Sequence, residues 1–112
     1  MINYNNKKFA PISNSENGEV SESTIFNYYQ EGQMLWADYS GADIKKGFLI
    51  GVVNDDDSLD FSYQHLNHKM EIRMGNCHSM PQVMPDGKLQ LYETWQWLNG
   101  DCSKGESMLK EV

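Results

Sequence analysis

The sequence is short of cysteine and arginine, and each shortage excludes a class of function. The two cysteines, Cys77 and Cys102, do not have the spacing of a zinc site, and neither His68 nor His78 completes a close pair of ligands. We therefore expect two free thiols, no metal and no other cofactor. Arg73 is the only arginine, and the net charge is −7 with a pI near 4.7. A chain without a basic stripe is not expected to bind nucleic acid or an anionic membrane.

Long apolar stretches are also absent. No run approaches the roughly 18 apolar residues that a membrane-spanning helix needs. The opening segment, MINYNNKKFA, lacks the apolar core of a secretory signal. We therefore expect a cytoplasmic protein that begins at Met1. The length of 112 residues corresponds to one domain, residues 1–112.

Turn signals, by contrast, recur about every 10 to 15 residues, which is the spacing of successive β-hairpins. The segments between them are rich in aromatic and β-branched residues, and none has a sustained apolar period of 3.6. Only residues 106–112 would also suit a helix. The predicted strands are Tyr4–Ala10, Ser23–Gln30, Met34–Ser40, Asp43–Val53, Leu59–Asn67, Met70–His78, Lys88–Leu98 and Ser107–Glu111.

Eight short strands joined mostly by tight turns predict an all-β protein, an eight-stranded antiparallel up-and-down β-barrel. Closure into a barrel leaves no exposed sheet edge. A barrel of this size has an interior just wide enough for side chains or for one small ligand. The main exception to the tight turns is a polar loop over residues 13–23.

Alternation along three strands predicts which side chains face the interior. The apolar face of strand 59–67 includes Tyr63 and His65. The apolar face of strand 70–78 includes Met74, and that of strand 88–98 includes two tryptophans. Trp95 and Trp97 are predicted either to pack as core or to form an aromatic cage. The candidate ligand-binding residues are therefore Tyr63, His65, Met74, Glu93, Trp95 and Trp97.

Glu93 is the unusual member of this set, because it shares a face with Leu89, Leu91 and the two tryptophans. The predicted loop lengths place it opposite Ile72 or Met74. Burial among apolar neighbours would raise the pKa of its carboxyl, so the group needs a partner or a ligand. We expect Glu93 to hydrogen-bond a buried Tyr or His. The alternatives are that a bulge turns it to solvent, or that a ligand is its partner.

The segment SMPQVMPDG, from Ser79 to Gly87, is longer than a hairpin turn and contains apolar residues between two prolines. It is predicted to fold over the barrel mouth as a flap or, alternatively, to plug one end.

Two longer stretches carry a resemblance: NSENGEVSESTIFNYYQEGQMLWADYSGADIKKGFLIG and YETWQWLNGDCSKGESMLKE. Together they make nearly the whole chain similar to a family of small bacterial proteins commonly labelled N-acetylglutamate synthase. More distantly, the chain resembles the calycin superfamily of avidins, lipocalins and fatty-acid-binding proteins. The run TWQWLNGD is similar to the late avidin strand that brings Trp to a binding pocket. This resemblance implies a barrel with a lumenal pocket at Trp95 or Trp97.

Three functions are compatible with these observations. The first is a non-catalytic barrel that binds a small molecule in its lumen or at its mouth. The second is a small enzyme in which Glu93 or His65 acts as a general acid or base. The third is a module that forms a homodimer through outward-facing aromatic residues such as Tyr29, Tyr39 or Tyr92.

The sequence also predicts that the chain has no acetyl-CoA-dependent activity. Acetyltransferases of the usual kind bind pyrophosphate at a Gly-rich turn between a strand and a helix, and this sequence has no such turn. Isothermal titration of the purified protein with acetyl-CoA should give no saturable signal. Acetyl transfer to glutamate would contradict the prediction.

Overall fold

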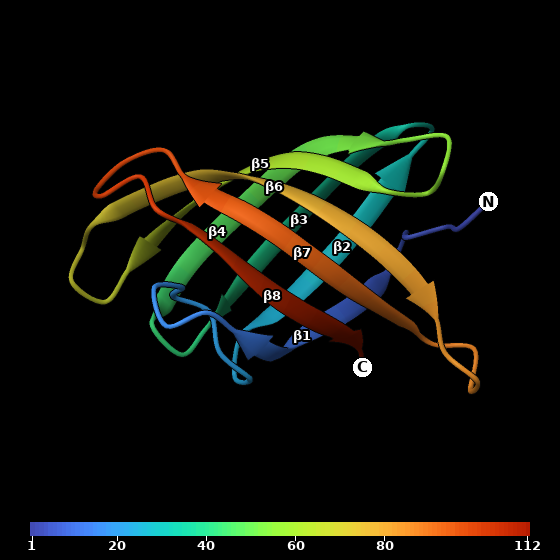
Figure 1. Cartoon of the computed structure of the whole chain (residues 1–112), viewed down its shortest axis with the longest axis horizontal. Helices are drawn as coiled ribbons and strands as arrows, with labels where there is room; N and C mark the ends of the chain where they lie inside the picture. Colours follow the sequence, from blue (N-terminus) through green and yellow to red (C-terminus); the bar gives the residue numbers. More distant parts are fainter.

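The computed structural model describes all 112 residues, which form eight β-strands and no helix. Each strand pairs antiparallel with the next, and β8 pairs with β1, so the sheet closes into a barrel (Figure 1). The predicted eight-stranded antiparallel barrel is confirmed. The strands are β1 (Lys7–Asn14), β2 (Ile25–Glu31), β3 (Met34–Gly41), β4 (Ile44–Val53), β5 (Leu59–Asn67), β6 (Ile72–Val83), β7 (Leu89–Trp97) and β8 (Lys104–Glu111). The fold offers no helix with the length and apolar character that a membrane crossing requires.

Tight turns join most strands, as the turn signals predict. Gly32 between β2 and β3 has a φ of 59°, and Gly87 between β6 and β7 has a φ of 85°. This left-handed backbone favours glycine, because glycine has no Cβ to clash with the carbonyl. The long connection is residues 15–24, between β1 and β2, which we call the covering segment.

The two ends of the barrel are closed differently. At one end the N-terminal segment folds across the opening, and the Tyr4 side chain is fully buried. Its hydroxyl donates a hydrogen bond of 2.6 Å to the carbonyl of Asp57, in the turn between β4 and β5. At the other end lie the turns from β5 to β6 and from β7 to β8, together with the covering segment (Figure 1). This second end carries the polar contacts described below.

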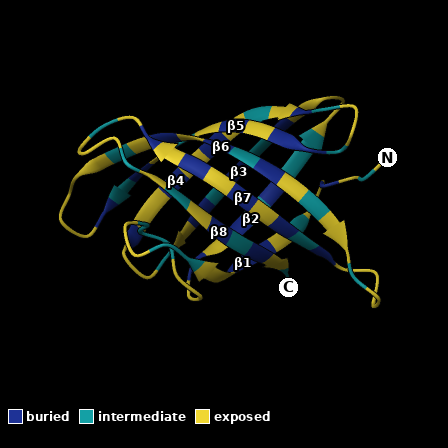
Figure 2. Cartoon of the chain, in the orientation of Figure 1, coloured by how far each residue is buried: buried dark blue, intermediate teal, exposed yellow.

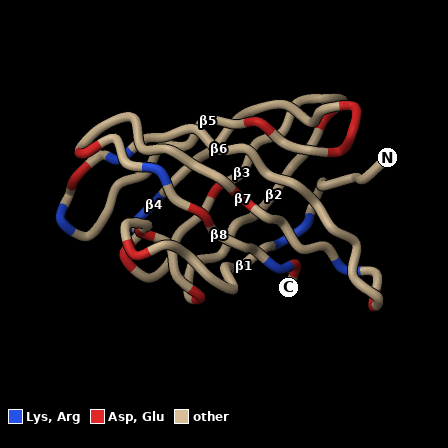
Figure 3. The backbone as a smooth tube through the Cα atoms, viewed as in Figure 1, with Lys and Arg blue, Asp and Glu red and all other residues tan.

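Side chains alternate between the interior and the solvent along most of the strands, which gives the banded pattern of Figure 2. The core consists mainly of leucine and aromatic side chains, and Leu35, Leu59, Leu91 and Leu109 are fully buried. Burying a leucine contributes roughly 1.5–3 kcal/mol to stability. The blue segments that mark lysine and arginine in Figure 3 are scattered along the backbone and do not gather on one part of it.

β6 differs most from its prediction, because it continues to Val83 instead of ending at His78. Its last residues pair with β7, so the predicted flap at Ser79–Gly87 was wrong. The pairing between β5 and β6 ends at Ser79, so β6 has only one neighbour at Pro81. A proline, which lacks a backbone N–H, is tolerated where a strand has an unpaired edge.

The inward face of β6 is also opposite to the prediction. Ile72 is 53% exposed and Met74 is 36% exposed, whereas Gly75, Cys77 and Ser79 face the interior. The reason is the space available, because the Tyr63 ring from β5 lies directly over Gly75. A Cβ at this position would collide with the Tyr63 phenol and with the backbone of β7. Small residues on β6 therefore accommodate large rings from its neighbours.

Replacing Gly75 by valine should destabilise the barrel by about 1–3 kcal/mol, because the added methyl groups overpack a filled interior. Met74→Val on the adjacent outward position is the matched control, with an expected change within about 0.5 kcal/mol. Urea unfolding followed by circular dichroism measures both. Equal effects at the two positions would contradict the inward placement of Gly75.

Candidate functional site

The interior of the barrel holds a cavity of about 50 Å³. Aromatic rings form much of its wall, with centroids 4.6 Å apart for Phe26 and Tyr39 and 5.5 Å apart for Trp95 and Trp97. The sequence-predicted residues that line it are Tyr63, His65, Glu93, Trp95 and Trp97. Met74 does not belong to this set: it lies on the outer face, so its prediction as a lining residue was wrong.

Glu93 lies on β7 between two serines, which are its direct cross-strand neighbours on β6 and β8. The Ser107 hydroxyl donates a hydrogen bond of 3.1 Å to Glu93 Oε1. Burial raises the pKa of Glu93 to about 7, although Ser107, Ser79 and Cys77 partly oppose this rise. The inward placement of Glu93 agrees with the sequence analysis. The expected Tyr or His partner was wrong, because the longer β6 places Ser79 rather than Ile72 or Met74 beside it.

Besides Asn14 Oδ1, three buried side-chain atoms have no hydrogen-bond partner in the protein. They are Glu93 Oε2, the Ser79 hydroxyl and the Tyr28 hydroxyl, on side chains that are almost fully buried. The negative charge of Glu93 is one of the causes that raise the pKa of Tyr28 well above its usual range, after burial. An unsatisfied buried polar group costs about 1–3 kcal/mol, and few are found in native proteins. The polar atoms beside Glu93 therefore have hydrogen-bonding capacity that the rest of the protein leaves unused.

Both ring nitrogens of His65, which also lines the cavity, have hydrogen-bond partners. Its Nε2 lies 2.9 Å from Glu19 Oε1, and its Nδ1 lies 2.8 Å from the Tyr39 hydroxyl. Because a carboxylate only accepts, Nε2 carries the hydrogen and Nδ1 accepts from Tyr39. Burial lowers the pKa of His65, although its hydrogen bond to Glu19 opposes this. His65 is therefore a neutral residue that ties β3, β5 and the covering segment together.

Glu19 brings the covering segment against the cavity. Besides His65, its carboxylate binds Arg73 at 2.7 Å and the Asn67 side-chain amide at 3.3 and 3.4 Å. The Trp97 indole N–H donates to the Asn17 carbonyl at 3.0 Å. The covering segment, and not the predicted flap, therefore closes this end of the barrel.

Arg73 is placed by stacking as well as by its ion pair. Its guanidinium lies 4.1 Å from the centroid of the Trp97 ring, which is a favourable cation–π geometry. The predicted inward placement of Met74 would put Arg73, its neighbour in the strand, on the outer face. The parity of Arg73 with Gly75 and Cys77 instead directs it toward the barrel mouth.

Sequence reasoning thus missed Glu19, Arg73, Ser79 and Ser107. Ser107 would have been the easiest of these to predict from the sequence, because it lies on the same face of a short strand as the apolar Leu109. For Glu19, no local signal separates it from the exposed acids Glu16 and Glu22 nearby.

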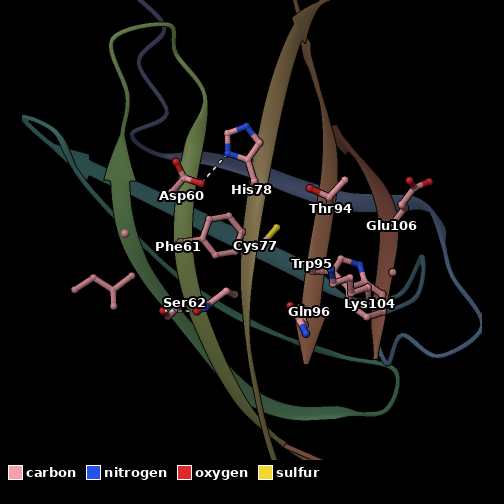
Figure 4. Close-up of a pocket in the computed structure, with 14 residues that line it drawn as sticks. Asp60, Phe61, Ser62, Cys77, His78, Thr94, Trp95, Gln96, Lys104 and Glu106 are labelled. Carbon is pink, nitrogen blue, oxygen red and sulfur yellow. Dashed lines mark hydrogen bonds and ion pairs between the residues drawn. The ribbon is translucent and has the colours of Figure 1, made fainter. Parts of the chain in front are cut away.

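A larger hollow of about 880 Å³ lies on the outer face of β5 to β8 (Figure 4). Four of its polar side chains form two pairs: His78 Nδ1 lies 2.7 Å from Asp60, and Ser62 donates to Asn76 at 2.9 Å. Ligand sites are usually concave and mostly apolar, and they bury most of the ligand. The smaller lumenal cavity meets this description better than the open outer groove.

The outward aromatic residues proposed for a dimer are only partly on the surface. Tyr39 is 2% exposed and belongs to the core, whereas Tyr29 stacks on Trp36 outside the barrel at 5.8 Å. The homodimer and the cytoplasmic location stay predictions.

Burial of the Glu93 carboxyl predicts a pH-dependent stability. Its pKa rises from 4.5 to about 7 on folding, so the folded chain keeps a proton where the unfolded chain has lost it. The free energy of unfolding should therefore fall as the pH rises from about 5 to about 8, by an amount on the order of 2 kcal/mol for Glu93.

Urea unfolding of the wild type and of Glu93→Gln at both pH values isolates this contribution. Glutamine does not titrate, and His65, whose lowered pKa acts in the opposite sense, is present in both proteins. If the free energies of unfolding of the wild type and of Glu93→Gln differ by the same amount at both pH values, the Glu93 carboxyl is not desolvated.

Comparison with known proteins identifies a family. The model of the family described as "Avidin-like protein" matches residues 2–112. No curated protein matches the chain significantly, and neither does any solved structure. The match agrees with the avidin part of the sequence resemblance, and no finding supports the N-acetylglutamate synthase label. Since the match covers almost every residue of a closed eight-stranded barrel, the chain belongs to the avidin-like family.

Proposed function

We propose that this barrel binds a small, flat organic molecule in its lumen and that Glu93 accepts hydrogen bonds from it. The observation that carries the proposal is the set of unpartnered polar atoms, Glu93 Oε2 and the hydroxyls of Ser79 and Tyr28, in an otherwise aromatic interior. A ligand with N–H or O–H donors would satisfy these atoms. Membership of the avidin-like family supports small-molecule binding by a barrel of this kind.

The wall favours a flat ligand. Trp95 and Trp97 line the cavity together with Phe61 and Tyr63, and these rings offer broad apolar faces. Aromatic faces attract planar groups by stacking and by removing apolar surface from water. The only carboxylate deep in the lumen is Glu93, so the polar end of the ligand is expected there.

The size of the cavity requires the barrel to open. A volume of about 50 Å³ is little more than the space that one or two water molecules occupy. An organic ligand must therefore displace part of the wall or of its cover. The residues that line the cavity from the covering segment are Gly18, Glu19 and Val20, and the route of entry that we propose is past them.

Acid–base catalysis is the second candidate function. A carboxyl with a pKa of about 7 suits a general acid or base, and His65 lines the same cavity. However, His65 is bound to Tyr39 and Glu19, and Glu93 is bound to Ser107, so the two do not form a hydrogen-bonded pair. Binding requires fewer assumptions than catalysis, and we propose it first.

The test is a screen of planar heterocycles with N–H donors, read by native mass spectrometry and by tryptophan fluorescence. For a compound that binds, Glu93→Leu should weaken binding about tenfold or more, because it removes the acceptor for a charge-assisted hydrogen bond. Glu93→Gln should have a smaller effect, because it keeps one acceptor oxygen.

Thr94→Val is the matched control, since Thr94 is the next residue along β7 but is exposed and lines the outer groove. Its binding should equal that of the wild type. Loss of binding in Thr94→Val and not in Glu93→Leu would move the site to the outer groove.

A further inference from the structure

The contacts of Glu19 have a feature that a simple loop anchor does not require. Its carboxylate is held by donors from three side chains, Arg73, His65 and Asn67, which lie 46 to 54 residues away in the chain. All three belong to the adjacent ends of β5 and β6. The covering segment supplies only the anion that they bind.

We propose that Arg73, His65 and Asn67 form an anion-binding subsite at the mouth of the barrel, which Glu19 occupies as an internal stand-in for an anionic group of the ligand. This inference rests on the proposed lumenal binding and adds the chemical class of the ligand. The ligand carries a carboxylate or a similar oxyanion at the end opposite the groups that reach Glu93.

The donors are arranged independently of Glu19. The Arg73 guanidinium stacks on Trp97, and its Nε donates to Asn99 Oδ1 at 3.4 Å. Asn99 is fixed in turn, because its amide donates to the Ile72 carbonyl at 2.7 Å. The guanidinium would therefore keep its position if Glu19 moved away, and its fork of donors matches the geometry of a carboxylate.

The position of Arg73 is also notable in a chain of this charge. The net charge is −7, and Arg73 is the only arginine, yet its guanidinium stacks on Trp97, a residue of the cavity wall, and is not free on the open surface. Its side chain is 20% exposed, and that of Glu19 is 18% exposed. Once Glu19 moves out, a partly desolvated cation faces the lumen, and an anion on the ligand would replace the lost partner.

The covering segment can move without a large loss of apolar contacts. Val20 is its one apolar side chain that packs against the core. Its other contacts are polar: Asn17 contacts Trp97, Ser103 and Lys104. Polar groups released from these contacts are solvated by water, which lowers the cost of opening.

Two related dyes test the subsite, the anionic anilinonaphthalene sulfonate and the uncharged phenylnaphthylamine. Both have the same aromatic body, so the ratio of their affinities reports on the anionic group alone. In Glu19→Gln this ratio should rise about tenfold in favour of the sulfonate, because Arg73 is no longer neutralised. Adding Arg73→Gln should remove the rise in the ratio, which is compared in place of single affinities because Arg73 also stacks on Trp97 of the cavity wall.

Glu16→Gln is the matched control, because it removes the same charge from an exposed position of the covering segment. Its ratio should equal that of the wild type. If Glu19→Gln strengthens both dyes equally, Glu19 is only a latch and the anion subsite is wrong. Near-UV circular dichroism establishes that each variant is folded.

A second measurement needs neither dye nor variant. Arg73 is the only arginine, so its side-chain Nε–H gives a single assignable NMR resonance. Acetate, titrated against chloride at constant ionic strength, should shift this resonance in the wild type, and more strongly in Glu19→Gln. A shift with acetate but no binding of either dye would keep the subsite and refute lumenal binding. Dye binding without any acetate shift or sulfonate preference would refute the subsite alone.

Discussion

The volume inside an eight-stranded barrel is the constraint on which the rest of the structure depends. This volume is fixed by strand number and tilt, and the inward side chains must fill it without excess. β5 and β7 fill it with Phe61, Tyr63, Trp95 and Trp97. β6 and β8 therefore carry small residues on the same face, with Gly75 under Tyr63 and Gly105 under Trp95. Ser79 and Ser107 follow the same rule, and they leave the carboxyl of Glu93 room between them. The polar centre of the lumen is thus a consequence of how large and small residues alternate around the barrel.

The same constraint explains how far the sequence could be interpreted. The closed barrel was predictable, because hairpin spacing and period-two alternation are local signals. The inward faces of β5 and β7 were also predictable, since only one face of each was apolar. For β6 the apolar face, with Ile72 and Met74, lies outside. Alternation divides the residues of a strand between two faces but does not show which face is inside. For β6 the inward face is decided by Tyr63 on β5, whose ring needs the space that Gly75 leaves. The candidate site was accordingly correct in its aromatic members and wrong at Met74.

The polar contacts at the mouth were beyond any local signal. The bonds of Glu19 to His65 and Arg73 span 46 and 54 residues, and only the closed fold brings these side chains together. Arg73 is conspicuous in the sequence as the only arginine. The face of β6 from which its side chain projects could not be predicted correctly, because the register of β6 was wrong. Because the wrong face of β6 was assigned to the interior, neither the partner of Glu93 nor the contacts of Arg73 could be predicted.

The two ends of the barrel differ in what opening them would cost, and this difference places the entrance. At the closed end the Tyr4 ring is fully buried and packs near Tyr28, so withdrawing it would expose a large apolar surface to water. At the other end the covering segment is held mainly by an ion pair and by hydrogen bonds to groups that water can solvate. Exchanging such contacts for water costs little, whereas exposing apolar area costs about 25 cal/mol for each Å². A ligand that itself supplies an anion for Arg73 and an apolar body for the tryptophans would replace what the opened barrel loses. The difference in cost therefore supports the proposed entrance beside Glu19, with the Tyr4 end as the floor.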